Sequence, residues 1–95
     1  MDEPRVYLDE ETRKDLLQRL RRIEGQVRGV QGMVERREPC DTILTQISAL
    51  RGAINQVGRI LLEEHMRSCI LEGLEESELK GELRRLQAAL KTFLS

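Results

Sequence analysis

The sequence predicts an all-α fold, and three observations carry this prediction. Apolar residues recur at steps of three and four along most of the chain, which is the spacing of one helix face. Pro4 and Pro39 are the only prolines, so few positions interrupt a helix. Hydrophobic residues make up 39% of the chain and are nearly all aliphatic, with Tyr7 and Phe93 as the only aromatics, whereas strands favour aromatic residues.

The first helix is expected over residues 10–36. Its apolar positions alternate spacings of four and three, as in a helix packed along a coiled-coil-like seam. These positions are Leu16, Leu20, Ile23, Val27, Val30 and Val34. Asp9 is suited to the N-cap, and Glu10 and Glu11 complement the helix dipole in the first turn.

The second helix is expected over residues 40–72, after Pro39 and before Gly73, which suits the C-terminal cap. Its seam consists of Cys40, Ile43, Ile47, Leu50, Ile54, Val57 and Leu61. This helix is unusually long for so small a domain, so it needs a packing partner.

The third helix is expected over residues 77–94, with Ser77 as its N-cap. Its seam consists of Leu79, Leu83, Leu86, Leu90 and Phe93. Short connections join the three helices, so we expect residues 1–95 to form a single domain.

A chain of 95 residues buries only about two-thirds of its unfolded surface, so oligomerisation is expected to enlarge the core. No apolar run reaches the roughly 18 residues of a membrane span, and the N-terminus does not resemble a signal peptide. We therefore expect a cytoplasmic protein that does not enter a membrane. The net charge of −1 conceals a basic segment, since residues 13–37 hold eight basic and three acidic residues, a net charge of +5.

Cys40, His65 and Cys69 are the residues that point to chemistry. His65 and Cys69 are four residues apart, so one helix face presents both side chains about 6 Å apart, close enough to share a metal ion. Taken alone, such a pair is more often an interfacial histidine and a buried cysteine than a metal site. What favours a metal site is that His65 is the only histidine and Cys40 the only other cysteine.

Cys40 cannot reach this pair within its own helix. The 25 and 29 residues that separate it from His65 and Cys69 correspond to roughly 37 to 43 Å at the rise of an α-helix. Two second helices packed antiparallel would place residue 40 of one opposite residues 65–69 of the other, with the crossing near Gly52 and Ala53. Those two small residues could equally be ordinary helix positions with no role in a crossing.

The donor set of two thiolates and one imidazole is soft, which favours a low-coordinate ion such as Cu(I) over octahedral Ni(II) or Co(II). Zn(II) is the main competitor, and it would require a fourth donor, which water, Glu64 or an N-terminal group could provide.

The chain resembles the CsoR/RcnR family of bacterial metal-sensing repressors, and the resemblance extends over nearly the whole chain. It rests on the segments Arg19–Gly29 (RLRRIEGQVRG), Cys40–Arg51 (CDTILTQISALR) and His65–Cys69 (HMRSC). The set Cys40, His65 and Cys69 matches the copper-sensing branch. The nickel and cobalt branches carry further histidines, the persulfide-sensing branch lacks the histidine, and formaldehyde sensors lack the second cysteine.

The resemblance implies an antiparallel four-helix-bundle dimer formed by the first two helices, and a homotetramer built as a dimer of dimers. It implies that the metal-free form binds operator DNA and that Cu(I) at the shared site releases it to derepress copper-resistance genes. The family has an acidic residue in the third helix that lies near the metal ligands without binding the metal, and this residue corresponds to Glu82. Copper sensors often carry a tyrosine before the first cysteine, where this chain has Pro39.

The resemblance also indicates a DNA-binding surface. On charge alone, the arginines of the first helix would be read as a solvated face. No helix-turn-helix or zinc-finger signature is visible, so the resemblance assigns DNA contact to a positive surface on the first two helices. The residues concerned are Arg19, Arg21, Arg22, Arg28 and Arg51.

Two other function classes bear comparison with a metal sensor. An enzyme is not expected, because the chain has one histidine, no hydroxyl nucleophile beside a base and no glycine-rich phosphate loop. A thiol- or persulfide-responsive repressor of the same family, acting through Cys40 and Cys69, is the alternative.

Overall fold

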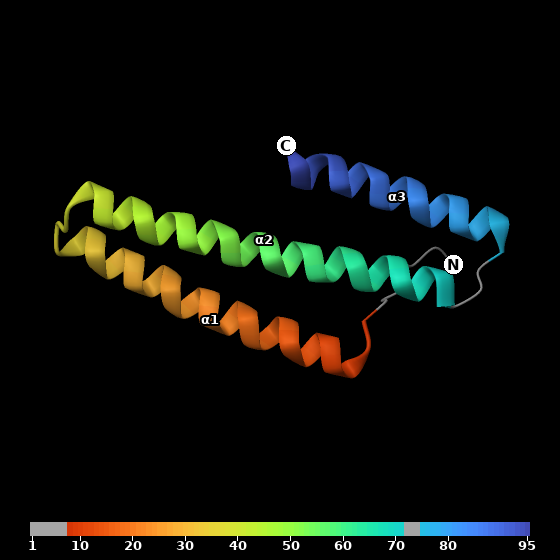
Figure 1. Cartoon of the computed structure of the whole chain (residues 1–95), viewed down its shortest axis with the longest axis horizontal. Helices are drawn as coiled ribbons and strands as arrows, with labels where there is room; N and C mark the ends of the chain where they lie inside the picture. Colours follow the sequence, from red (N-terminus) through yellow and green to blue (C-terminus); the bar gives the residue numbers. More distant parts are fainter. Residues whose placement is uncertain (1–7, 72–74) are drawn as a thin grey trace. The chain divides into compact units, whose positions relative to one another are not determined.

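The computed structural model describes residues 8–71 and 75–95, with the side chains of residues 69–71 outside the described part. It contains three helices: α1 (Glu10–Glu35), α2 (Cys40–Leu71) and α3 (Glu76–Leu94), shown in Figure 1. Each boundary lies within one residue of the expected span. The predicted all-α, three-helix architecture is confirmed. Residues Asp9–Ile60 form one compact unit, and Leu61–Ser95 belong to a second.

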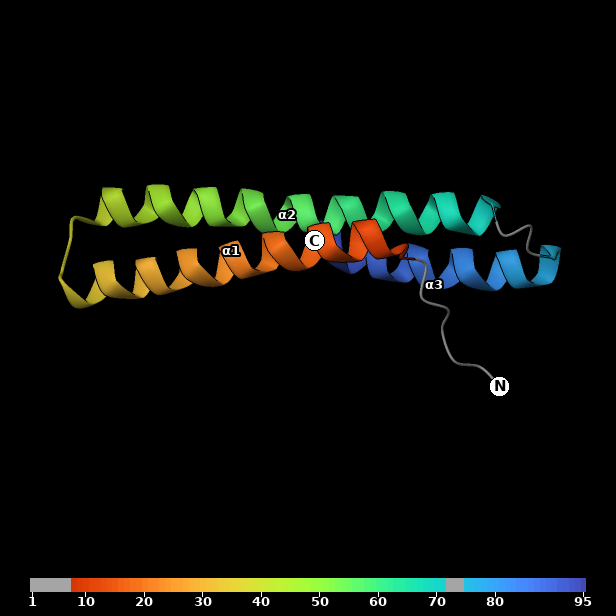
Figure 2. The ribbon, with the colours of Figure 1, turned by 90° about the horizontal axis from the view of Figure 1, so that it is seen from below.

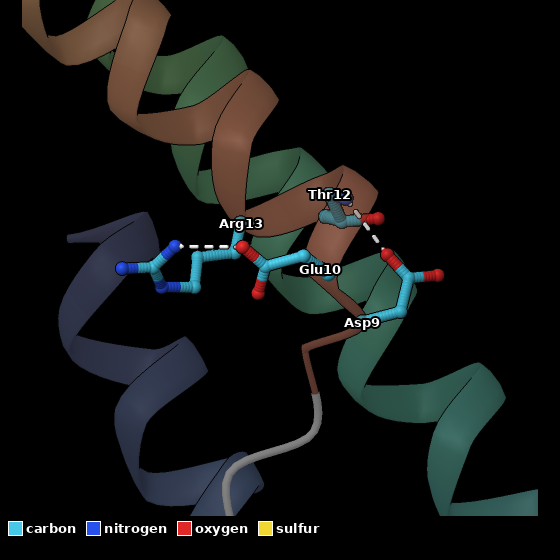
Figure 3. Close-up of polar contacts among 4 residues, drawn as sticks. All are labelled: Asp9, Glu10, Thr12 and Arg13. Atoms are coloured by element: carbon cyan, nitrogen blue, oxygen red, sulfur yellow. Dashed lines mark hydrogen bonds and ion pairs between the residues drawn. The ribbon is translucent and has the colours of Figure 1, made fainter.

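The N-terminus of α1 is fixed by a side-chain cap (Figure 3). Asp9 adopts an extended backbone, and its Oδ1 accepts a hydrogen bond of 2.7 Å from the backbone N–H of Thr12. Arg13, which lies about one turn after Glu10, donates from Nη1 to Glu10 Oε1 at 3.1 Å. The cap satisfies one of the N–H groups that a helix start leaves without a partner, so the predicted role of Asp9 is confirmed.

The turn between α1 and α2 is a Schellman motif. The N–H of Glu38 donates to the carbonyl of Met33, and the N–H of Arg37 donates to that of Val34, each at 3.1 Å. Arg37 has a φ of 56°, the left-handed conformation in which such turns usually place glycine. Arg36 and Glu38 form an ion pair of 2.8 Å across the turn. This turn leads directly into Pro39 and thus sets the position at which α2 begins, at Cys40.

In the unit Asp9–Ile60, α1 and the first part of α2 run antiparallel and side by side, as Figures 1 and 2 show. The buried apolar side chains of this unit are Leu16, Ile23, Leu50 and Val57. Within each helix these residues are seven positions apart. The alternate positions of the same seams are exposed, so this core uses only half of each predicted stripe.

In the unit that begins at Leu61, α3 runs antiparallel to the last part of α2 (Figures 1 and 2). On α3, Leu79, Leu86 and Leu90 are half-buried, and Glu82 is buried.

The predicted N-cap of the third helix was wrong. The carbonyl of Glu75 accepts the N–H of Leu79 at 2.9 Å, so α3 starts at Glu76 and Ser77 lies inside the first turn. Glu75 occupies the cap without a side-chain hydrogen bond. The expected C-terminal cap at Gly73 lies outside the described residues. Among the helices described, none combines the length and apolar character needed to cross a membrane.

Candidate metal centre and DNA-binding surface

Cys40 is the first residue of α2, and its thiol is free and exposed. It directly follows the Schellman turn and Pro39, whose carbonyl accepts the N–H of Ile43 at 3.1 Å. The first turn of the helix thus holds the backbone of Cys40, while its side chain stays open to solvent. An exposed thiol at a fixed backbone position can act as a soft metal ligand once it is deprotonated.

His65 lies near the opposite end of α2 and is mostly buried, with 25% of its side chain exposed. Its Nε2 is 3.5 Å from Oε2 of Glu82, a residue of α3. This pair links the two helices of its unit. The acidic residue that the family resemblance places near the metal ligands thus lies beside the candidate ligand His65.

Glu82 has a second partner in addition to His65. Its side chain is only 11% exposed, and Oε1 accepts a hydrogen bond from Nη2 of Arg85, three residues further along α3. The two carboxylate oxygens therefore contact different groups. Sequence reasoning did not identify Arg85, although the spacing from Glu82 is one that commonly allows an ion pair on a helix.

Glu64 precedes His65 and is also mostly buried. Its Oε1 lies 2.6 Å from Nη2 of Arg67, so an ion pair on its own helix engages this carboxylate. The sequence offered Glu64 as a fourth donor for zinc. Its pairing with Arg67 makes it a poorer candidate, because metal binding would have to break this contact.

Cys69 follows His65 by four residues within α2, while its side chain falls outside the described part. Among the side chains that the structure describes, no group of three histidine, cysteine or acidic residues converges in a way that could hold a metal ion. In a single chain, Cys40 and His65 occupy the two ends of one helix.

The arginines expected to contact DNA fall into two groups. Arg21, Arg22 and Arg28 on α1 and Arg51 on α2 are exposed, and none of them forms an ion pair within the described ranges. Arg19 is partly buried and donates from Nε to Oδ2 of Asp15 at 3.1 Å. The spacing of four residues between Asp15 and Arg19 could have indicated this pairing.

Comparison with known proteins identifies the family. A sequence model described as the metal-sensitive transcriptional repressor matches residues 12–93. The chain belongs to this family. The resemblance deduced from the residues is therefore confirmed, and the helices described above are those of a family whose members regulate transcription.

Two curated relatives are identical to the chain at about two-fifths of the aligned positions. The copper-sensing transcriptional repressor CsoR of Bacillus subtilis (strain 168) is 41% identical over 75 residues, which are 79% of this chain and 74% of that protein. The copper-sensing transcriptional repressor RicR of Mycobacterium tuberculosis is 42% identical over 74 residues, which are 76% of this chain and 77% of RicR.

Two solved structures share the fold. The copper-sensing repressor CsoR with Cu(I) from Geobacillus thermodenitrificans NG80-2 is 42% identical, with a TM-score of 0.83 and coverage of 99% of this chain and 95% of that one. The nickel-responsive transcriptional regulator InrS is also 42% identical, with a TM-score of 0.72 and coverage of 84% and 90%. Relatives that respond to different metals are thus equally similar in sequence.

Proposed function

We propose that this metal-sensitive repressor responds to Cu(I). Its metal-free form binds operator DNA, and Cu(I) bound by Cys40 of one chain with His65 and Cys69 of another releases the DNA and derepresses copper-resistance genes. The observation that carries the proposal is the distribution of three soft donors along α2, one at its first residue and two near its end. As a regulator rather than an enzyme, the single domain of residues 1–95 would act in the cytoplasm, where its operator lies.

The helix geometry supports a site shared between chains. At the rise of an α-helix, Cys40 and His65 are about 37 Å apart on α2, too far for one ion. On an ideal helix with 3.6 residues per turn, however, Cys40, His65 and Cys69 fall within an arc of about 40°. Two copies of α2 that pack antiparallel on this face would bring residue 40 of each to residues 65–69 of the other.

The exposed half of each seam supports the same pairing. In α1 and α2, the alternate seam positions remain open to solvent in the single chain. They are Leu20, Val27, Val34, Ile47, Ile54 and Leu61. A second copy that covers this stripe completes an antiparallel four-helix bundle, whose two-fold axis makes both metal sites equivalent. The family resemblance implies that two such dimers pair into a homotetramer.

The donor set, rather than overall identity, favours copper. Copper-sensing and nickel-responsive relatives are equally identical to this chain, so percentage identity does not discriminate. Two thiolates and one imidazole suit Cu(I), whereas Ni(II) sites use more nitrogen and oxygen donors. Zinc would need a fourth ligand, and Arg67 already engages the carboxylate of Glu64, the protein side chain considered for that place.

The contact between His65 and Glu82 supports a role for His65 as a ligand. Because Nε2 faces Glu82, Nδ1 is the nitrogen that would bind the metal. Histidine ligands commonly use their second nitrogen to contact a carboxylate, which orients the ring and increases its basicity. Since Glu82 belongs to α3, the same contact offers a route from the metal centre to a second helix.

The charge distribution supports DNA binding. Residues 13–37 carry a net charge of +5, from eight basic and three acidic residues. The exposed Arg21, Arg22, Arg28 and Arg51 can neutralise phosphates without first breaking an ion pair described in the chain. Arg19 contributes less to this surface, because Asp15 offsets its charge.

One titration tests the proposal. Under anaerobic conditions, Cu(I) is added to the protein bound to a fluorescent operator, and metal content and DNA binding are followed together. We expect one Cu(I) per chain, sulfur and nitrogen neighbours in X-ray absorption, and DNA affinity lowered by about tenfold or more. His65→Ala should bind DNA in the metal-free state but retain it when copper is added.

Two results would contradict the proposal. Mainly oxygen and nitrogen neighbours around the ion would exclude the thiolates as ligands. If a persulfide donor releases the operator while Cu(I) does not, the protein is instead a thiol-responsive repressor. It would then use the exposed Cys40 of one chain and Cys69 of the other.

A further inference from the structure

Among the residues that the structure describes, Glu82 is the buried charged residue. It is only 9% exposed, although a buried carboxylate is costly unless a cation or hydrogen-bond donors compensate it. Its described contacts are His65 through Oε2 and Arg85 through Oε1. Of these two partners, only Arg85 is permanently charged, so Arg85 provides the constant compensation for Glu82.

Arg85 also constrains the direction of the carboxylate. Glu82 and Arg85 are three residues apart on α3, and the contact through Oε1 limits the rotation of the glutamate side chain. Oε2 is then directed at Nε2 of His65, on the other helix of this unit. Without Arg85, the carboxylate could rotate towards solvent, and α3 would lose its polar link to His65.

We propose that Arg85 is a positioning residue that fixes the Glu82 carboxylate to α3. A change at His65 then moves α3, and this movement changes the affinity of the protein for DNA. The inference rests on the proposed metal response and adds a residue to it. Within the described residues, Arg85 pairs with Glu82 and not with a proposed ligand, so it should influence how strongly metal and DNA binding are coupled and leave the metal affinity nearly unchanged. The competing view is that Arg85 and Glu82 form a surface ion pair that has no effect on metal response, since half of the Arg85 side chain is exposed.

The first test uses metal-free protein. His65 is the only histidine in the chain, so the nitrogen NMR spectrum of its ring is free of overlap. In the parent, the contact with Glu82 should favour the tautomer that carries its proton on Nε2. Arg85→Met should shift the spectrum in the same direction as Glu82→Gln does, and Arg85→Lys should return part of the parent signal. Arg84→Met is the matched control, because Arg84 is exposed on α3 and forms no ion pair within the residues described.

The second test measures Cu(I) affinity and operator release in the same variants. Arg85→Met should reduce the copper-induced loss of DNA affinity by about fivefold or more, while its Cu(I) affinity stays within about twofold of the parent. A ring spectrum of Arg85→Met identical to the parent's would overturn the proposal, as would parental coupling in that variant. If the parent binds no Cu(I), the proposed function fails, and the NMR comparison still decides whether Arg85 positions Glu82.

Discussion

Leu50 and Ile54 lie one turn apart on α2, yet Leu50 is 9% exposed and Ile54 is 51% exposed. The chain's own helix pair covers one residue and leaves the other open. Ile54→Asp should therefore spare the fold of the single chain but weaken dimerisation by about a hundredfold, because each copy loses about 1.5 kcal/mol or more of apolar burial. Sedimentation velocity over a concentration series measures this change.

Ala49→Asp is the matched control for this substitution. Ala49 is exposed, and on an ideal helix it lies on the side of α2 opposite Cys40. Ala49→Asp introduces the same charge into the same helix, and we expect this variant to dimerise as strongly as the parent. Equal weakening by both variants would show that the added charge, rather than the apolar stripe, determines the result.

Mixed dimers test the shared metal site directly. Cys40→Ala and Cys69→Ala should each fail to bind Cu(I) tightly as homodimers, because each removes one thiolate from both sites. A heterodimer of the two variants restores one complete site, formed by Cys40 of the Cys69→Ala chain with His65 and Cys69 of the other. Differently tagged, co-expressed chains should thus recover about half of the parental copper capacity. A heterodimer no better than either homodimer would exclude sites shared in this way.

Salt dependence tests the DNA-binding arginines. Arg22→Ala and Arg51→Ala should weaken operator binding and flatten its dependence on salt, by about 0.9 in logarithmic slope for each phosphate that the protein no longer neutralises. Fluorescence anisotropy at several salt concentrations measures both effects. Lys91→Ala removes the same charge from α3, outside the proposed surface, and should leave the slope unchanged. Parental slopes in both arginine variants would place the DNA contact elsewhere.

The Schellman turn offers a test of stability. Arg37 adopts a left-handed backbone, which costs an L-residue other than glycine about 1 kcal/mol. Arg37→Gly should therefore raise the free energy of unfolding by about 0.5 to 1 kcal/mol, measured by urea denaturation at one protein concentration. Arg36→Gly is the control, because Arg36 has a φ of −80° and gains nothing from glycine. A loss of stability in Arg37→Gly would show that the arginine side chain matters more than its backbone strain.

Periodicity predicted the helices but not how their apolar faces divide. Leu16 and Leu20 belong to the same seam in the sequence, yet only Leu16 is buried in the single chain. The spacing of three and four describes one apolar stripe and carries no information on which half packs within the chain. The left-handed Arg37 could not be predicted either, because that position in a Schellman turn usually requires glycine.

The site was predictable to a different extent. The helical spacing of His65 and Cys69 and their distance from Cys40 are properties of the sequence, and together they predict that a site built from all three residues needs a second chain. The contact between His65 and Glu82 joins residues 17 positions apart on different helices, so it depends on tertiary packing. The family resemblance indicated only that Glu82 lies near the metal ligands. The three-residue spacing of Glu82 and Arg85 allows an ion pair between them, but this spacing alone does not single out Arg85.

The unbroken course of α2 from Cys40 to Leu71 has a consequence for the cell. One chain carries its soft donors at opposite ends of a helix. An ion that binds donors from both ends therefore has to take them from two chains, and it acts as a cross-link between the molecules. Mass action then connects metal retention to the abundance of the protein, because dilution that separates the chains also removes the site. Conversely, each bound ion would hold its two chains together, so scarcity of the protein and scarcity of the metal would reinforce each other.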